Sequence, residues 1–269
     1  MGSIAGDKKT KFLNVLYKYK DMGNYIELVK KYFPFSENET KGFFIAVIAM
    51  TFVVAFNDNS DSFVLSHWVG NFLIWLVIVF VSFFIHTAGY RLAALKVGYR
   101  HEFQLWWYGL LFGLIIMLLS RGSIWVLIPA GVWIHHMAIH RLGKFRYGPN
   151  VFSFAMVSLM GPLSSILFAG VIKTFQVWFG LTLISADFVQ KIFIFNMAFA
   201  AYSLAPIPPL AGSRIFFSSR LTYVLIAASV IGYAVLIWFN VYSYLFALVI
   251  GVIAWFLFYL LFEKGAWKF

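Results

Sequence analysis

The sequence has no cysteine and few charged side chains, and these absences exclude several classes of protein. Without Cys, the chain has no disulfide, no thiolate metal ligand and no thiol nucleophile. Only 12% of its 269 residues are charged, about half the share found in ordinary soluble domains. In their place, 62% of the residues are hydrophobic. Water cannot accommodate so much apolar surface, so we predict a membrane protein and exclude soluble enzymes and nucleic-acid-binding proteins.

Hydrophobic runs follow one another from residue 43 almost to the end of the chain. They lie at about 43–57, 63–90, 105–120, 124–140, 151–172, 189–210, 221–240 and 243–262. A straight membrane-spanning helix needs about 20 apolar residues, so the two short runs between 105 and 140 either cross or form a re-entrant hairpin. We therefore predict an all-α polytopic membrane protein with about eight hydrophobic segments, of which six to eight span the membrane.

The charged residues predict the orientation of the chain. Residues 1–42 form a basic tail with two short amphipathic helices, the second of which ends before Pro34. If all eight segments cross, 18 of the 21 Lys and Arg fall on one side. Positive residues stay in the cytoplasm, so we predict a multi-pass protein of the cell membrane with both termini cytoplasmic. Its membrane domain covers residues 43–269, with basic residues facing the headgroups of the lipid bilayer.

Three motifs contain polar or helix-breaking residues that are unusual in lipid-facing helices. FIHTAGYRLAA at 84–94 ends the second hydrophobic run, MGPLSS lies at 160–165, and SLAPIPPLAGSR lies at 203–214. A broken backbone at membrane depth is tolerated where it is buried in protein or lines a cavity. The two proline motifs therefore predict a groove. None of the ten acidic residues lies in the middle of a run, so we expect no buried carboxylate for acid–base chemistry.

In this order, the motifs resemble the site-2 protease family of intramembrane zinc metalloproteases, and its archaeal members most. That family has His-Glu-x-x-His on a transmembrane helix, then a Gly-Pro segment, then Asn-Leu-x-Pro-x-Pro-x-x-Asp-Gly. The resemblance covers about residues 63–220 and includes 99–110, which is similar to a strand-like piece of the family. It implies a site-2-protease-like core followed by a C-terminal helical pair at 221–262.

The departures from the family pattern fall at its catalytic positions. The resemblance places His86 at the first zinc ligand, Thr87 at the general base, Tyr90 at the second histidine and Ala211 at the ligand aspartate. Thr is no carboxylate base, Ala has no ligand atom, and Tyr is a weak zinc ligand because its phenol has a pKa of about 10. We therefore expect a pseudoprotease, not an enzyme, with no zinc and no other cofactor.

The predicted groove depends on backbone geometry and not on the zinc ligands. Its residues are Gly161, Pro162, Ser165, Ser203, Pro206, Pro208, Pro209 and Gly212. In the resembling proteases such a groove receives an extended substrate segment, which can pair with it like an added strand. We therefore expect the groove to bind a transmembrane segment of a partner, or to make the chain a subunit or adaptor of a membrane complex.

Two other functions stay open. His135, His136 and His140 lie in WIHHMAIH, and the i, i+4 spacing of the last two on a helix would present both to one metal. A metalloprotease with a non-standard metal site that includes His86 is therefore one alternative, although contact with headgroups is the more ordinary role for these side chains. A solute-translocating protein is the second, but internal repeats and membrane-embedded charges are both missing.

Two isolated histidines carry weaker signals. His101 lacks a second histidine at metal-ligand spacing, so it is a poor candidate ligand. His86 is expected to hydrogen-bond inside the helix bundle, with Tyr90 one turn away as the nearest partner.

Overall fold

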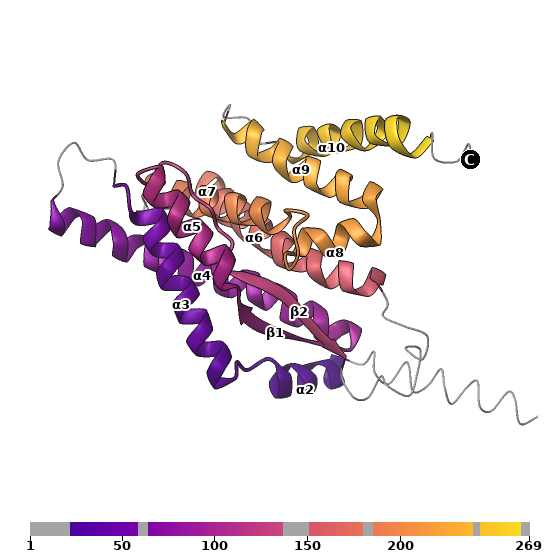
Figure 1. Cartoon of the computed structure of the whole chain (residues 1–269), viewed down its shortest axis with the longest axis horizontal. Helices are drawn as coiled ribbons and strands as arrows, with labels where there is room; N and C mark the ends of the chain where they lie inside the picture. The colour runs from indigo at the N-terminus through magenta and orange to yellow at the C-terminus, as the bar shows by residue number, and fades with distance from the viewer. Residues whose placement is uncertain (1–21, 59–63, 137–150, 180–184, 239–242, 265–269) are drawn as a thin grey trace, which may run out of the picture.

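The computed structural model describes residues 22–58, 64–136, 151–179, 185–238 and 243–264 of the chain (Figure 1). These residues are mostly helical, as predicted, with one short two-stranded sheet. In chain order the elements are α2 Met22–Tyr32, α3 Glu37–Ala55, α4 Leu65–Val97, β1 Tyr99–Leu105, α5 Trp107–Leu119, β2 Ala130–His136, α6 Val151–Phe179, α7 Ala186–Ser203, α8 Ala211–Ser218, α9 Arg220–Trp238, α10 Tyr244–Phe258 and a π-helical turn Tyr259–Glu263.

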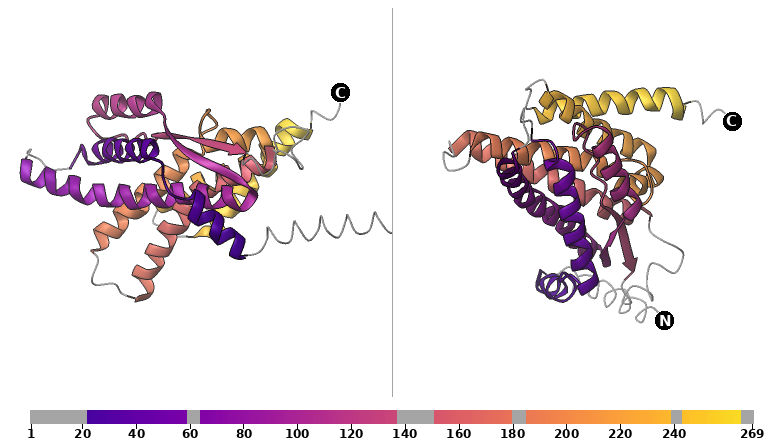
Figure 2. Two further views of the ribbon diagram at one scale, coloured as in Figure 1. Left: turned by 90° about the horizontal axis from the view of Figure 1, so that it is seen from below. Right: turned by 60° about the vertical axis from the view of Figure 1, so that its left-hand side comes forward.

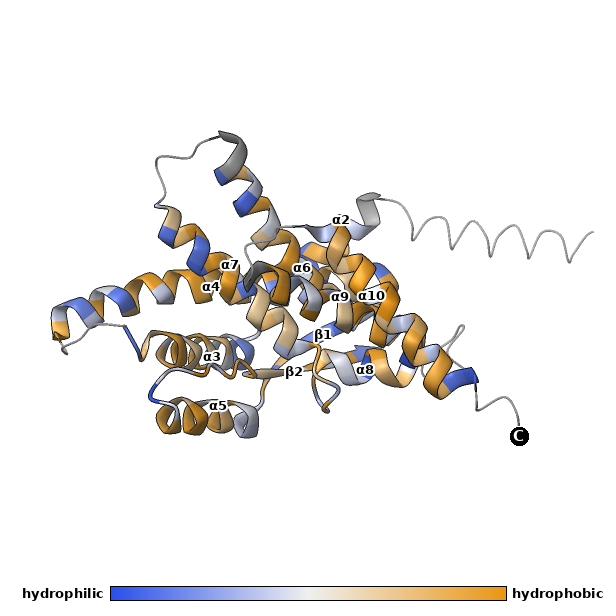
Figure 3. Cartoon of the chain, turned by 90° about the horizontal axis from the view of Figure 1, so that it is seen from above, coloured by the Kyte–Doolittle hydropathy of each residue, from blue (hydrophilic) through white to orange (hydrophobic). Residues whose placement is uncertain are grey.

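Four of the described helices are long and apolar enough to cross a membrane. They are Glu37–Ala55, Leu65–Val97, Val151–Gln176 and Tyr244–Glu263. Figure 3 shows hydrophobic residues along the length of the helices, with many of the hydrophilic ones near their ends. This arrangement supports a membrane protein. Four is fewer than the six to eight spans that the sequence predicts, so that number and the cytoplasmic termini stay predictions.

The region at 105–140 departs most from the predicted helices. α5 has 13 residues, which corresponds to a length of about 20 Å, well short of a hydrocarbon core of about 30 Å. In the second run, expected to be helical, residues 124–129 are irregular and residues 130–136 form β2. Val132, Trp133 and Ile134 are β-branched or aromatic, and such residues favour strands. The chain therefore goes out as a short helix and returns through an irregular segment and a strand.

The sheet lies across the middle of the molecule, against α4 (Figure 1). β1 and β2 pair antiparallel, with a register that runs from Tyr99 opposite His136 to Leu105 opposite Ala130. Between α4 and β1, Gly98 adopts a left-handed conformation with φ 88° and caps the helix, a position that suits a residue without a side chain. The resulting reversal brings β1 back alongside α3 and α4.

The main core lies between α3, α4, β1 and α7, and a cluster of aromatic rings occupies its centre. Phe83 on α4 lies at its centre, with its ring 4.9 Å from that of Phe43, 5.6 Å from that of Phe103 and 5.6 Å from that of Phe199. These four side chains are buried. Because they come from four elements, this cluster fixes the position of β1 relative to the helices α3, α4 and α7.

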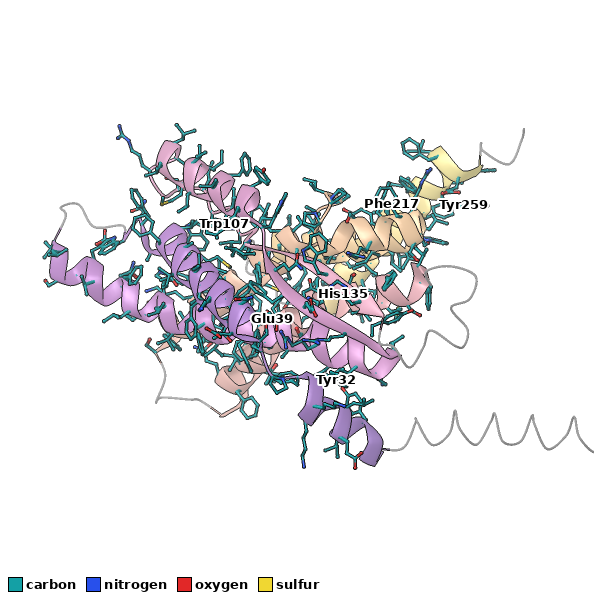
Figure 4. The ribbon with its side chains drawn as sticks, turned by 60° about the horizontal axis from the view of Figure 1, so that its bottom comes forward. Tyr32, Glu39, Trp107, His135, Phe217 and Tyr259 are labelled. Atoms are coloured by element: carbon teal, nitrogen blue, oxygen red, sulfur yellow. The ribbon has the colours of Figure 1, made fainter. Side chains whose placement is uncertain are left out.

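A buried ion pair connects the start of α3 to α4 and to the sheet. The carboxylate of Glu39, which is 7% exposed, accepts hydrogen bonds from the guanidinium of Arg91 and from the backbone N–H of Phe103. Figure 4 shows Glu39 where α3, α4 and the sheet meet. Glu39 is thus a buried carboxylate just before the first hydrophobic run, and its pairing with Arg91 gives it a structural role rather than one in acid–base chemistry.

α9 and α10 form an antiparallel pair that lies beside α8, on the side of the molecule away from α3 (Figures 1 and 2). The two helices pack along much of their length: the rings of Tyr233 and Tyr244 stack with centroids 4.6 Å apart, and Gly251 lies against Leu225 and Ser229. α9 packs against α7 and α8, whereas α4 is covered by α3, α6 and β1.

Candidate functional site

The first and third motifs meet at a small cavity between α4, the sheet and the segment that joins α7 to α8. Its volume is about 30 Å³; since one water needs roughly 10–15 Å³, the cavity admits a small polar group. Most of the wall is apolar, and the polar side chains come from α4, β1 and α7. The lining residues are Phe83, His86, Thr87, Tyr90, His101, Phe103, Leu127, Pro129, Ala130, Gly131, Val132, Phe199, Ser203, Leu210 and Ala211.

His86 lies at the centre of a hydrogen-bonded network on one side of the cavity. Its Nδ1 is 2.8 Å from the hydroxyl oxygen of Ser165, and its Nε2 is 3.1 Å from the hydroxyl oxygen of Tyr90. A neutral imidazole has one donor and one acceptor, and a hydroxyl serves as either. Both ring nitrogens therefore have a partner, one of them the Tyr90 expected from the helical spacing.

Close packing of α4 against α6 makes this network possible. A Cβ atom at Gly161 would lie 2.1 Å from Cζ of Tyr90, and one at Gly89 would lie 2.5 Å from the hydroxyl oxygen of Ser164. Both distances are far below van der Waals contact, so only glycine fits at these two positions. The two glycines let the helices approach closely enough for Ser165 on α6 to reach His86 on α4.

The proline segment between α7 and α8 closes the cavity against β2. Its peptide bond between Pro208 and Pro209 is cis, and the carbonyl of Pro209 accepts a hydrogen bond of 2.9 Å from the backbone N–H of Val132. The side chain of Arg214 donates to the carbonyl of Val132 at 2.6 Å. Gly212 allows the tight turn, since a Cβ atom there would lie 1.9 Å from the carbonyl oxygen of Leu204.

These contacts occupy the middle of both outer edges of the sheet. On β2, both backbone groups of Val132 are used by Pro209 and Arg214. On β1, the N–H of Phe103 is used by Glu39. A bound segment that added a strand at these positions would have to displace the chain's own contacts. The expected strand-like mode of binding is therefore disfavoured at these positions. The side chains that line the cavity are the remaining groups that can contact a ligand.

His101 is the polar side chain that the sequence analysis undervalued. It points from β1 into the cavity, is 3% exposed and stacks on Tyr90 with ring centroids 5.1 Å apart. No described residue hydrogen-bonds to either of its ring nitrogens. Burial, with the nearby charges of Arg91 and Arg214, lowers the pKa of His101 to about 3, so the ring is neutral near pH 7. Each unmet hydrogen-bonding group costs about 1–3 kcal/mol.

The residues at the expected ligand positions do not fit a zinc ion. Ala211 contributes a buried methyl group, and the Nε2 of His86 faces the hydroxyl of Tyr90. Zinc sites in proteins use three or four His, Cys, Asp or Glu ligands. Within the part of the chain that the structure describes, no three such side chains are grouped closely enough to hold a metal ion.

The other histidine cluster lies on β2 and not on a helix. His135 is exposed, and its Nε2 is 3.4 Å from a carboxylate oxygen of Glu102. Figure 4 shows His135 on the strand. His135 does not line the cavity, and the side chain of His136 and the whole of His140 lie outside the described part of the chain.

The predicted groove residues have different positions relative to the cavity. Ser203 lines it directly, and Gly161 and Ser165 support it from α6 through Tyr90 and His86. The others shape the backbone: Pro162 lies inside α6, Pro206 and Pro208 are exposed on the connecting segment, and Pro209 and Gly212 pack against β2 and the end of α7.

Comparison with known proteins supports the same family. The chain is 26% identical over 207 residues to a Methanocaldococcus jannaschii protein named "Putative zinc metalloprotease MJ0611". The alignment covers 75% of this chain and 95% of that protein. No family model matches the chain, and no solved structure matches it.

The relative also corrects one expectation. From Thr87, Tyr90 and Ala211 the chain was expected not to be an enzyme, but the name of the relative points to a protease. The expectation is therefore contradicted, even though the described residues hold no three-ligand metal site. The similarity supports a site-2-protease-like membrane protein.

Proposed function

We propose that this chain binds a transmembrane segment of another membrane protein at the cavity beside His86. The observation that carries the proposal is that α4, β1, β2 and the α7–α8 connection converge on one cavity with polar side chains in an otherwise apolar domain. Polar groups inside a membrane domain are costly and usually mark a function. The similarity to a protein named as a protease supports a polypeptide as the ligand, because a protease has to bind one.

The proposal concerns binding, the step that proteolysis and partner capture share. Two features support binding without a metal ion. The residues at the expected ligand positions include Ala211 and Tyr90, and the polar groups of Ser165, Tyr90 and His86 already satisfy one another. A segment held in this way suits a subunit or adaptor of a membrane complex in the lipid bilayer.

Photo-crosslinking in native membranes tests the proposal. A photoreactive phenylalanine analogue at Ile207, which is 51% exposed beside the cavity, should crosslink to a transmembrane segment of one defined membrane protein. The same analogue at Phe217 on α8, which is 71% exposed, serves as the control. Mass spectrometry of the crosslinked peptides identifies the partner segment. Lipid adducts alone at both positions would refute the proposal.

A further inference from the structure

The two histidines of the cavity differ in one respect. Both nitrogens of His86 have hydroxyl partners, from Ser165 and Tyr90. Both nitrogens of His101 are buried, and no described residue reaches them. Buried polar groups in native proteins almost always have a partner, so the two nitrogens of His101 indicate a group that this part of the chain does not itself supply.

The direction of the His101 ring favours a group inside the cavity. Along β1 the buried side chains alternate with the others, and His101 lies on the buried face with Tyr99 and Phe103. Its ring stacks nearly parallel on Tyr90, with an interplanar angle of 21°. The nitrogens lie in the plane of the imidazole. Stacking on Tyr90 covers one face of the ring and leaves the nitrogen-bearing edge free to hydrogen-bond a ligand.

The charges around His101 restrict the chemical class of ligand that can bind beside it. Arg91 and Arg214 are close enough to lower the pKa of His101, and none of the lining residues is acidic. This environment disfavours a cation. The imidazole itself, when neutral, offers one donor and one acceptor, which matches a neutral group that has both. A lipid acyl chain has neither, whereas a carboxamide or a peptide group has both.

We propose that His101 is the specificity-determining residue of the cavity, and that it hydrogen-bonds a neutral donor–acceptor group of a bound transmembrane segment, such as an Asn or Gln carboxamide or an unwound peptide group. This inference rests on the proposed function. In lipid such a group has few partners and gains by finding one inside a protein. His101 therefore selects segments with a polar interruption over uniformly apolar ones.

A pair of synthetic peptides tests this selection. The full-length protein is reconstituted in lipid nanodiscs and titrated with a fluorescent Lys-flanked peptide of about 20 leucines, or with the same peptide carrying one central Asn. The wild-type protein should bind the Asn peptide about tenfold more tightly, as expected for one good hydrogen-bonded pair. His101→Phe should abolish this preference. The matched variant His135→Phe, which replaces an exposed histidine outside the cavity, should keep it.

A second measurement separates selection from simple loss of folding. Without peptide, His101→Phe should melt at a higher temperature than the wild type, because it replaces unmet polar groups with an apolar ring of similar shape. A lower melting temperature together with an unchanged peptide preference would overturn the proposal, since the nitrogens would then serve the free protein through a bound water.

The remaining outcomes also decide the question. Equal binding of both peptides by the wild type would overturn the role of His101 and leave the proposed function in place. Binding of neither peptide would count against the proposed function itself. About one equivalent of zinc in the purified wild type that is lost in His101→Phe would assign the nitrogens to a metal ion and overturn the proposal.

Discussion

Replacing Glu39 by Ala should destabilise the protein by about 3–5 kcal/mol, because it leaves the guanidinium of Arg91 buried without a counter-charge. The side chain of Glu39 is 7% exposed and that of Arg91 is 2% exposed, so solvent screens neither. The change also removes the acceptor for the N–H groups of Phe103 and Ser36, each 2.8 Å from a carboxylate oxygen. The effect should therefore lie toward the upper end of this range.

In Glu39→Ala the guanidinium of Arg91 keeps three other contacts, and these limit the loss of stability. Arg91 also donates to the carbonyls of Phe33 at 2.7 Å and of Pro34 at 3.2 Å, and it lies 3.8 Å from the centre of the Phe35 ring. These contacts hold the side chain in place but provide no negative charge. Glu39→Gln should cost less than Glu39→Ala, because the amide oxygen can still accept from Phe103.

The double variant Glu39→Leu, Arg91→Met separates the ion pair from its surroundings. Replacement of a buried ion pair by apolar side chains of similar volume is often neutral or stabilising. The double variant should therefore be more stable than Glu39→Ala. The assay is equilibrium unfolding of the detergent-solubilised protein by increasing amounts of SDS. If Glu39→Ala lies within about 0.5 kcal/mol of the wild type, the ion pair contributes little to the stability of the contact between α3, α4 and β1.

Three further predictions concern the cavity. The triple variant T87E/Y90H/A211D should bind about one zinc per chain by elemental analysis, because all three positions line one cavity with His86; a folded variant without zinc would contradict this. Gly161→Ala should cost about 1–3 kcal/mol by pushing Tyr90 aside, whereas Gly70→Ala, which meets nothing within 4 Å, should be neutral or slightly stabilising in the same SDS titration. Burial lowers the pKa of His101 to about 3 in the folded state, against about 6.5 in the unfolded state, so between these pH values the unfolded chain binds an extra proton. The stability contribution is intact above pH 6.5, falls by up to about 1.4 kcal/mol per pH unit between pH 6.5 and about 3, and does not change further below that. A wild type no more acid-sensitive than His101→Phe would refute this.

Hydropathy and helix length predicted most of the helices, since long apolar runs leave few alternatives to a helix in a membrane. The short run at 124–140 was ambiguous because periodicity alone does not separate a buried strand from a buried helix. Its β-branched and aromatic residues, Val132 to Ile134, were the available signal for a strand. The pairing of Glu39 with Arg91 was not visible, because the two residues are distant in the sequence and no local pattern connects them.

The sequence predicted the contact between His86 and Tyr90 but not the position of His101. The first depends on spacing within one helix, and the second on how a strand packs against another element. The spacing of His86 and Tyr90 on one helix predicted their contact, which lies within one turn. The role of His101 depends instead on the alternation in YRHEF, where Tyr99, His101 and Phe103 share the buried face of a strand. That alternation was present in the sequence, but it identifies a cavity residue only once β1 is known to face α4.

The arrangement of the two buried histidines connects the fold to the proposed binding. A histidine inside a membrane domain needs partners, and His86 obtains them from Tyr90 and Ser165 because Gly161 lets α6 approach α4. The same close approach places Tyr90 where its ring supports His101 from one side. The close approach of α6 to α4 thus gives His86 its hydrogen-bond partners and places Tyr90 against the ring of His101. The polar groups of His101 are the ones left for a ligand, which is why a substitution there should separate selection of a bound segment from stability of the fold.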